Sequence, residues 1–289
     1  MPNTRDIRNR IRGVKNTQKI TRAMQLVAAS KMKKAQDRAL QGRPYAKQLS
    51  RMLASLNGKI EDFNHPFLEE REIKKRGILV ISTDRGLCGS LNANLFREIT
   101  NIERDSAGFI TIGRKARQFI SRTGRDLLAD FPISEEAHFK ELRPVVEFLV
   151  EQFKEGAIDT IEVLYPRFKN TLVQEPTRIP FLPLASLDEY VEDQAEANHE
   201  KLLEDSRELV FEPNPEIILT ELLERFVKRE IYQMLVDARA SEHSARMVAM
   251  KAATDNANKL TDSLTLQYNK ARQAGITQEI LEITAAAQH

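Results

Sequence analysis

The first 60 residues carry apolar and small side chains at every third or fourth position. This 3.5-residue period is typical of a helix that packs along a left-handed coiled coil. The recurring seam positions are Ile7, Ile11, Val14, Gln18, Thr21, Gln25, Ala28, Met32, Ala35, Ala39, Gly42, Ala46, Leu49, Leu53, Leu56 and Ile60. Small members let two helix backbones approach closely, and polar members fix the register of the pair. Gly42 and Pro44 should kink this helix or end its first segment.

The end of the chain repeats this design. Its start signal is an N-cap asparagine, Asn214, followed by Pro215 at the first helical position and Glu216 in the first turn. No proline follows Pro215. The seam consists of Val227, Ile231, Met234, Ala238, Ser241, Ala245, Val248 and Ala252, and after a slip it resumes at Ala257, Leu260, Leu264, Tyr268 and Ala271.

Two helices of this length cannot fold into a compact globule. Helices over residues 4–57 and 215–285 would be about 81 Å and about 107 Å long. Neither is stable alone, because ordering so many residues costs more free energy than one apolar seam supplies. The simplest partner of each helix is the other, paired antiparallel, with the C-terminal helix projecting by about 26 Å.

Between the two helices, short apolar runs alternate with helical patterns. Strands are expected at 77–82, 109–112, 158–165 and 172–180, and helices at 90–104, 114–122 and 135–155, with Pro144 opening the second half of the last helix. Residues 185–210 read as an acidic loop or weak helix. The predicted fold class is therefore an α/β central domain plus a long antiparallel two-helix coiled coil formed by the N- and C-terminal helices. The expected segments are residues 1–60, 61–213 and 214–289.

Basic residues are concentrated at the start of the chain. Residues 1–57 contain 14 Lys or Arg against two acids, whereas the remaining residues hold 30 basic and 40 acidic groups. Such segregation indicates a polyanionic or acidic partner, although the acidic end of the chain itself could also balance the charge. A second apolar line, Ile20, Met24 and Val27, lies roughly 100° around the helix from the seam. One partner helix cannot cover both, so we expect a second protein around this helix rather than a globular core.

No catalytic constellation stands out in the middle of the chain. Gly86–Gly89 follows a strand and precedes a helix, as phosphate-binding loops do, but a lone GxxG favours a tight turn with Ser90 as helix cap. Gly108–Lys115 has the spacing of a P-loop without its lysine and hydroxyl positions. Asp84–Cys88 is best interpreted as a salt-bridged loop with a half-buried thiol. One cysteine and five scattered histidines indicate no disulfide or metal site, and no apolar run is long enough to cross a membrane.

Several long runs carry a resemblance to a known family. They are Asp6–Arg8, Asn16–Met24, Val27–Met32, Arg43–Ala46, Asp84–Gly89, Ala245–Asn256 and Tyr268–Ile280. These runs lie at both ends and in the centre of the chain, in the right order, and closely resemble the gamma subunit of the rotary F-type ATP synthase. The resemblance covers the whole chain, and runs this long are highly specific.

The resemblance implies a central rotating shaft with no catalytic site of its own. In this family the coiled coil stands inside a ring of alpha and beta subunits, and the α/β body sits with epsilon on the membrane c-ring. The turning ring rotates the asymmetric shaft, so that each catalytic beta site cycles through states of different nucleotide affinity. The expected partners are the alpha, beta, delta and epsilon subunits and the c-ring. The chain should bind no cofactor, nucleotide or nucleic acid.

No transit peptide precedes Met1, so the expected location is the cytoplasmic face of the bacterial plasma (inner) membrane, as a peripheral subunit. Chloroplast members carry a dithiol insert for redox control, and a chain with Cys88 alone cannot form that internal switch.

The resemblance also implies positions that contact the beta subunits. They are Lys19, Arg22 and Met24 on the N-terminal helix, and Arg246, Gln273 and Thr277 on the C-terminal helix, with Ile276, Ile280 and Ile283 as an apolar tip. Gly275 departs from a good helix former and should loosen the helix there by up to about 1 kcal/mol relative to alanine.

Two other functions are compatible with parts of the pattern. A nucleic-acid-binding protein could place the basic N-terminal helix in a groove, but this leaves the equally long C-terminal helix unexplained. A static coiled-coil tether would use both helices without moving parts. Salt-dependent DNA titration would identify the first alternative, and rotation of single complexes separates a shaft from a tether.

Overall fold

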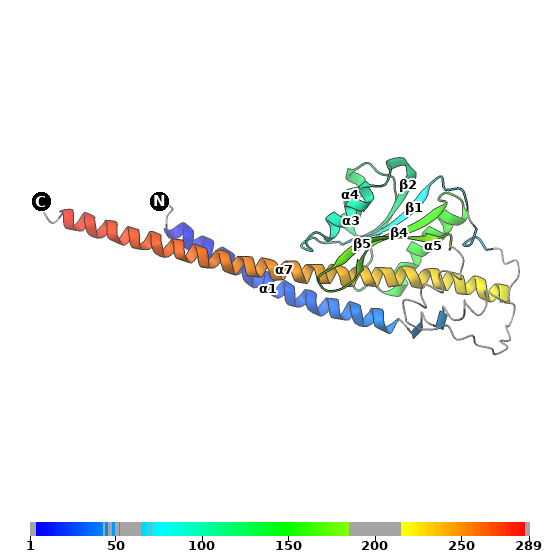
Figure 1. The fold of residues 1–289 in the computed structure, drawn as a ribbon, viewed down its shortest axis with the longest axis horizontal. Coiled ribbons are helices and arrows are strands. Elements are labelled where there is room, and N and C mark those ends of the chain that lie inside the picture. Colours follow the sequence, from blue (N-terminus) through cyan, green and yellow to red (C-terminus); the bar gives the residue numbers. More distant parts are fainter. Residues whose placement is uncertain are drawn as a thin grey trace. The chain divides into compact units, whose positions relative to one another are not determined.

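The computed structural model describes residues 4–42, 44–45, 48–49, 52, 65–69, 71–184 and 215–286. The chain divides into two compact units: unit 1 consists of Met1–Ser30 and Arg246–His289, and unit 2 of Lys31–Ala245. Two long helices contribute to both units, α1 (Thr4–Gln41) and α7 (Pro215–Ala286), drawn in blue and from yellow to red in Figure 1. Helix α1 ends just before Gly42, which confirms the break predicted there.

Unit 2 is built on a five-stranded sheet. Its strands are β1 (Arg76–Ile81), β2 (Ala107–Ile112), β3 (Leu127–Phe131), β4 (Thr160–Phe168) and β5 (Gln174–Leu182). They lie in the order β3-β2-β1-β4-β5, with β5 antiparallel to β4 and every other pair parallel. Strand β1 lies at the centre and is apolar on both faces, as parallel strands covered by helices are. The α/β sheet predicted from the sequence is confirmed.

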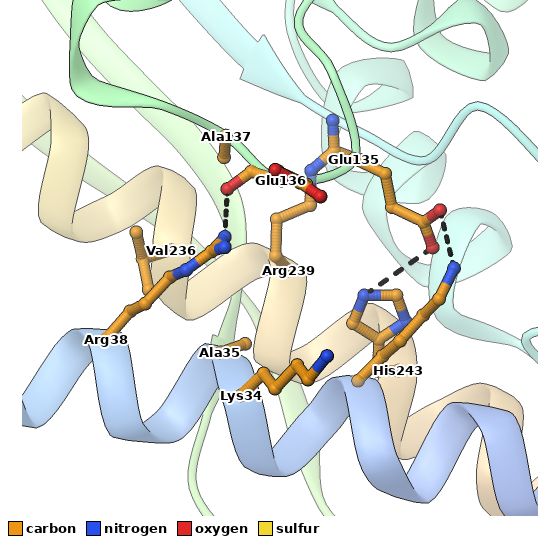
Figure 2. A pocket seen from close by; sticks show the side chains of 10 residues that line it. Lys34, Ala35, Arg38, Glu135, Glu136, Ala137, Val236, Arg239 and His243 are labelled. Carbon is orange, nitrogen blue, oxygen red and sulfur yellow. Dashed lines mark hydrogen bonds and ion pairs between the residues drawn. The ribbon is translucent and has the colours of Figure 1, made fainter.

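The strands are connected by the helices α3 (Leu91–Thr100), α4 (Arg114–Arg122) and α5 (Arg143–Lys154) and the 3-10 turns η1 (Arg104–Ser106) and η2 (Phe139–Leu142). The secondary structure of this region differs from the prediction in one helix and one strand. The helix predicted over 135–155 is wrong in its first half: α5 begins beside Pro144, because proline lacks the N–H that a helix interior needs. The pattern also fails to predict β3, whose Ala129 and Asp130 are uncommon in strands. The loop before η2 faces α1 and α7 (Figure 2).

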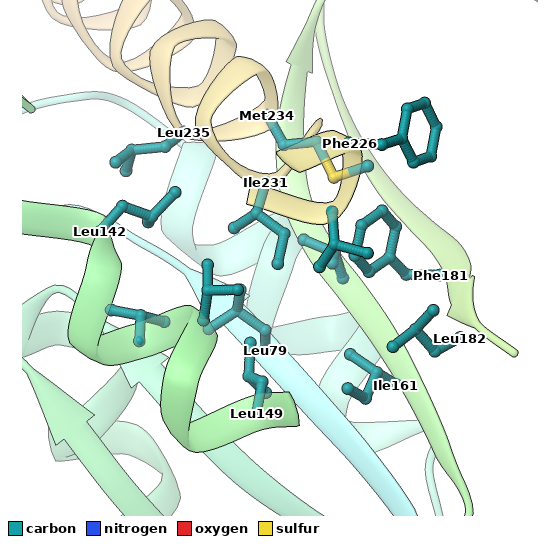
Figure 3. Packing of buried hydrophobic residues seen from close by; sticks show 14 of the residues in the cluster. Leu79, Leu142, Leu149, Ile161, Phe181, Leu182, Phe226, Ile231, Met234 and Leu235 are labelled. Atoms are coloured by element: carbon teal, nitrogen blue, oxygen red, sulfur yellow. The ribbon is translucent and has the colours of Figure 1, made fainter. Parts of the chain in front are cut away.

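Each face of the sheet carries its own apolar core. One face packs against α3 and α4, with Leu95, Ile99 and Ile120 among its buried members. The other packs against α5 and the first part of α7 (Figure 3). Val227, Ile231, Met234 and Ala238 belong to this second core. Their assignment to the coiled-coil seam is therefore wrong, because an apolar stripe at helical spacing packs equally well on a sheet.

In unit 1 the two long helices run antiparallel, as predicted. The Arg8 guanidinium donates a hydrogen bond to the Tyr268 hydroxyl at 2.7 Å, and the hydroxyls of Thr21 and Thr254 lie 2.8 Å apart. Residue numbers therefore rise on α1 as they fall on α7, and the two ribbons lie side by side in Figure 1.

The seam prediction holds on α1, and in the part of α7 that belongs to unit 1 it fails at two positions. None of the predicted positions from Ile7 to Ala39 is exposed. On α7, Ala252 and Leu260 are exposed, whereas Met250 and Thr254 are buried. The seam thus continues through threonine without the slip, because Thr254 pairs with Thr21 across the interface. The N-cap Asn214, the segment 185–210 and the seam positions Ala46, Leu53, Leu56 and Ile60 lie outside the described residues.

Candidate partner-contact surface

The first part of the predicted contact surface lies on α1 within unit 1. Lys19 and Arg22 are exposed, and Met24 is half-buried. The second apolar line beside them stays uncovered by α7, since Ile20 is 60% and Val27 is 55% exposed. A helix presenting large apolar side chains within a cationic coat is suited to a partner with acidic and apolar groups.

The second part lies at the end of α7. Gln273, Thr277 and Ile280 are all exposed, as is Ile276 at 49%. The Thr277 hydroxyl donates to the Gln273 carbonyl at 2.9 Å, so it is already used by the helix backbone. A partner would meet both apolar and polar side chains there.

The predicted residues do not form one compact site. Arg246 is half-buried where α7 enters unit 1. It lies about 40 Å along the helix from Gln273, at 1.5 Å per residue. Met24 lies between these levels, because neighbouring Thr21 pairs with Thr254. The arrangement is a surface distributed along a rod, which can be gripped at several levels.

The structure adds exposed apolar residues that the periodicity did not single out. Leu26 on α1 is 58% exposed and lies roughly 100° around the helix from Val27. Leu266 on α7 is 72% exposed. The sequence signal for both is a leucine off the seam of a helix that is otherwise polar on its outer face.

The two helices of unit 1 differ in charge. Residues 1–30 contain seven Lys or Arg and one acid, whereas residues 246–289 contain five Lys or Arg and four acids. One side of the pair is therefore strongly cationic and the other nearly neutral. A partner surface meets a different charge on each side of this rod.

In unit 2, side chains of α7 contact the carboxyl ends of β1 and β4. Open α/β sheets bind their ligands at the carboxyl ends of the strands, at the point where the strand order reverses. In this sheet that point lies between β1 and β4. Asp237 of α7 accepts a hydrogen bond at 3.0 Å from the N–H of Phe168, the last residue of β4, and Arg239 lies 3.9 Å from Asp84 after β1. Polar groups of α7 thus contact the chain at the carboxyl ends of both strands.

The loop after β1 is a turn held by ionic contacts, as the sequence indicates. The Asp84 carboxylate accepts the Arg114 N–H at 3.1 Å, in addition to its contact with Arg239. The prediction of a half-buried thiol is wrong, because Cys88 is only 2% exposed and receives a hydrogen bond from Asn92. Ser90 occupies the N-cap position of α3, but its side chain makes no capping hydrogen bond.

Two further properties concern only the described part of the chain. There, no group of three or more His, Cys, Asp or Glu side chains could hold a metal ion. No helix among these residues is both long and apolar enough to cross a membrane.

A family model described as ATP synthase matches residues 3–288. The class of protein to which this fold is similar is the ATP synthase central stalk and rotor. One similar solved structure is the central stalk and c-ring assembly of the Tetrahymena thermophila mitochondrial ATP synthase, with a TM-score of 0.60 and 25% identity over 81% of this chain and 99% of that one. Another is the OSCP/F1/c-ring assembly of the Euglena gracilis mitochondrial ATP synthase, with a TM-score of 0.69 and 19% identity over 99% of this chain and 93% of that one. The second likeness concerns the fold alone.

Sequence relatives identify the family. The ATP synthase gamma chain of Opitutus terrae is 55% identical over 291 residues, which cover 99% of this chain and 98% of the relative. The gamma chain of Methylacidiphilum infernorum is 44% identical over 99% and 98%, and that of Heliobacterium modesticaldum 40% identical over 99% of each. The chain belongs to the ATP synthase gamma chain family.

Proposed function

We propose that the chain is the central rotating shaft of an F-type ATP synthase. It couples ion-driven rotation of the membrane ring to ATP synthesis and hydrolysis in the catalytic beta subunits. The observation that carries this proposal is the uncovered line of Ile20 and Val27 beside Lys19 and Arg22, on a coiled coil whose own seam is already filled. Membership of the gamma chain family over the whole chain supports it.

The mechanism follows from asymmetry. The cationic α1 and the nearly neutral α7 turn past each beta subunit in succession, so each catalytic site meets surfaces of different charge. A rotor can shift a site between nucleotide affinities only through such differential interactions. The chain itself supplies no catalytic group in this mechanism, and the chemistry takes place in the beta subunits.

In this proposal an acidic loop of a beta subunit contacts Lys19, Arg22 and Met24. At other levels the beta subunits contact Arg246, Gln273, Thr277 and Ile280. The α/β layers of unit 2 meet the epsilon subunit and the c-ring, and the alpha and delta subunits complete the assembly. The shaft works at the cytoplasmic face of the bacterial inner membrane, attached through the complex. The bacterial relatives support this location.

Rotation of single complexes tests the proposal. The chain is assembled with alpha and beta subunits fixed to a surface, and a bead is attached to unit 2 through an introduced cysteine. We expect the bead to rotate in one direction while ATP is hydrolysed. Complexes that hydrolyse ATP with a stationary bead would identify a static tether instead.

A further inference from the structure

The two long helices are attached to unit 2 in different ways. Helix α7 is embedded in apolar contacts, with Leu223 and Ile231 fully buried against the sheet. The large apolar core includes Leu49, which follows α1, but none of its members comes from the described residues of α1 itself. In unit 2, the buried side chains of α1 are small, such as Ala35. Van der Waals packing alone therefore contributes little to the attachment of α1.

A hollow separates α1 from the neighbouring loop. It measures about 160 Å³ and lies between α1, residues 135–137 and α7. Seven polar residues line it, and six of them form what we call the collar: Lys31 and Arg38 on α1, Glu135 and Glu136 in the loop, and Arg239 and His243 on α7 (Figure 2). Since the space is not filled by apolar groups, polar contacts must hold α1 here.

Helix α1 reaches the loop through two of these contacts. Lys31 Nζ donates to Glu135 Oε2 at 2.7 Å, and Arg38 donates to the main-chain carbonyl of Glu136. Glu135 also lies 3.9 Å from His243 Nε2, so its carboxylate stands between the two helices. The Lys31 hydrogen bond helps to keep the pKa of Glu135 below its ordinary value, against the opposing effect of burial.

Arg239 holds the loop in position. Its guanidinium donates to the carbonyls of Ile133 at 3.2 Å and Ser134 at 3.4 Å, and to the Glu242 carboxylate at 3.0 Å. Arg239 is only 4% exposed, and a buried arginine with several acceptors is rigidly placed. Ala137 in the same loop has a φ of +50°, a conformation that the surrounding contacts must maintain.

We propose that Arg239 is a positioning residue for torque transfer and that the collar is the joint through which unit 2 drives α1. Force passes from the apolar core to α7, from Arg239 to the loop, and from Glu135 and Glu136 to Lys31 and Arg38. This inference rests on the proposed shaft function. Exposed ion pairs contribute little singly, so the joint depends on the buried arginine that fixes their geometry.

The first experiment loosens the joint without leaving an unpaired buried charge. Arg239→Met is combined with Glu242→Gln in the full chain, and amide hydrogen exchange is followed over α1 and the sheet. We expect residues 31–41 to exchange about tenfold faster while β1 and β2 keep their protection. In the assembled membrane enzyme, ATP-driven ion uptake per ATP hydrolysed should fall.

Two further variants separate positioning from general stability. Arg239→Lys keeps a donor at this position and should restore part of the protection of α1. Arg117→Met removes an ion pair with Asp130 in the same unit, where neither residue lines the hollow, and should leave both α1 exchange and coupling unchanged. Equal loss of protection in the sheet and in α1 would mean that Arg239 is merely a structural residue and would overturn the proposal.

A surface variant keeps the test decisive if the buried change prevents folding. Lys31→Ala with Arg38→Ala removes both ties from α1, and we expect faster exchange of α1 and weaker coupling. Unchanged exchange and unchanged coupling in this variant would refute the joint. If wild-type complexes do not rotate at all, the shaft function fails, whereas the exchange data still decide whether the collar holds α1.

Discussion

The half-buried Asp237 on α7 binds the end of β4, near the buried Tyr165. Burial raises the pKa of Asp237, although its carboxylate accepts the Phe168 N–H. Burial, assisted by the nearby Asp237 charge, raises the pKa of Tyr165 to about 12. At this position α7 gains a directional contact with the sheet and bears the cost of desolvating a carboxylate.

Replacing Asp237 by asparagine should reveal that cost. The folded-state pKa of Asp237 lies above the ordinary value of 3.8, so the folded state binds more protons than the unfolded state. Wild-type stability therefore falls as pH rises from about 4 through the folded-state pKa. Asp237→Asn keeps an acceptor for Phe168 and should be at least as stable as wild type at pH 7, with no advantage below about pH 4. Chemical unfolding at several pH values measures this, and a deficit independent of pH would contradict it.

A charge introduced at Met24 should affect coupling more than assembly. Met24 is half-buried beside exposed Lys19 and Arg22, so Met24→Lys adds a third cation to the proposed beta-contact surface. An unpaired charge at such a contact typically costs about 2 kcal/mol or more of interaction energy. ATP-driven ion uptake should fall while ATP hydrolysis and subunit stoichiometry persist. Met24→Leu, uncharged and similar in volume, is the control; normal coupling in the lysine variant would count against the contact.

At the scale of elements, one glycine sets the turn from β2 into α4. Gly113 has a φ of +101°, and a Cβ there would lie 2.4 Å from the Ser82 carbonyl oxygen. Ser82 in turn accepts the Ala116 N–H through its hydroxyl at 2.9 Å. The turn therefore joins the end of β1 to the first turn of α4.

Alanine at this glycine should destabilise unit 2 strongly. Backbone strain and the collision with main chain should together lower the free energy of unfolding by roughly 3 kcal/mol for Gly113→Ala. Gly124→Ala is the matched control, because Gly124 also has a positive φ, +63°, but open space around its Cβ position. That variant should lose only about 1 kcal/mol. Equal losses in thermal or denaturant unfolding would show that the collision with Ser82 is relieved.

The seam of α7 shows why periodicity alone misplaces some contacts. An apolar pattern favours Leu260 as a seam residue, yet this leucine is 41% exposed and Thr254 is buried instead. The facing residue on α1 determines which position of α7 is buried. Thr21 provides a hydroxyl that pairs with Thr254, and a paired polar seam position fixes the register of the two helices. The same holds for Val227 and Ile231, whose stripe packs on a sheet rather than on a helix.

At the scale of the molecule, α7 serves three purposes along one continuous helix. Its first part belongs to the sheet core, its middle carries the collar, and its last part pairs with α1 in unit 1. Beyond Tyr268 the helix continues to Ala286 with mostly exposed side chains. Stability and partner contact are thus separated along its length.

A shortened chain should separate these two roles. Ending the chain at Arg272 removes the exposed end that includes Thr277 and Ile280. We expect the free energy of unfolding to change by less than about 0.5 kcal/mol, because few buried contacts are lost. Coupling in the assembled enzyme should weaken. Ending at Ala257 instead also removes buried Leu264 and should destabilise unit 1 by about 2 kcal/mol or more; a large loss in the longer variant would contradict the separation.

The long paired helices, the α/β layer between them in the chain and the family were all predictable from the amino-acid sequence. These features depend on local periodicity, turn residues and extended runs such as Ala245–Asn256, which are readable along one chain. The sequence also predicted the uncovered line on α1, because one partner helix cannot cover two apolar stripes.

Which residues contact each other across the fold became known from the three-dimensional structure. The hydrogen bonds from Arg239 to the carbonyls of Ile133 and Ser134 join groups more than 100 residues apart, and no local pattern encodes them. The burial of Cys88 and the change of partner along α7 have the same origin. Side-chain period specifies that a face will be buried, whereas the identity of its partner depends on how distant elements pack against each other.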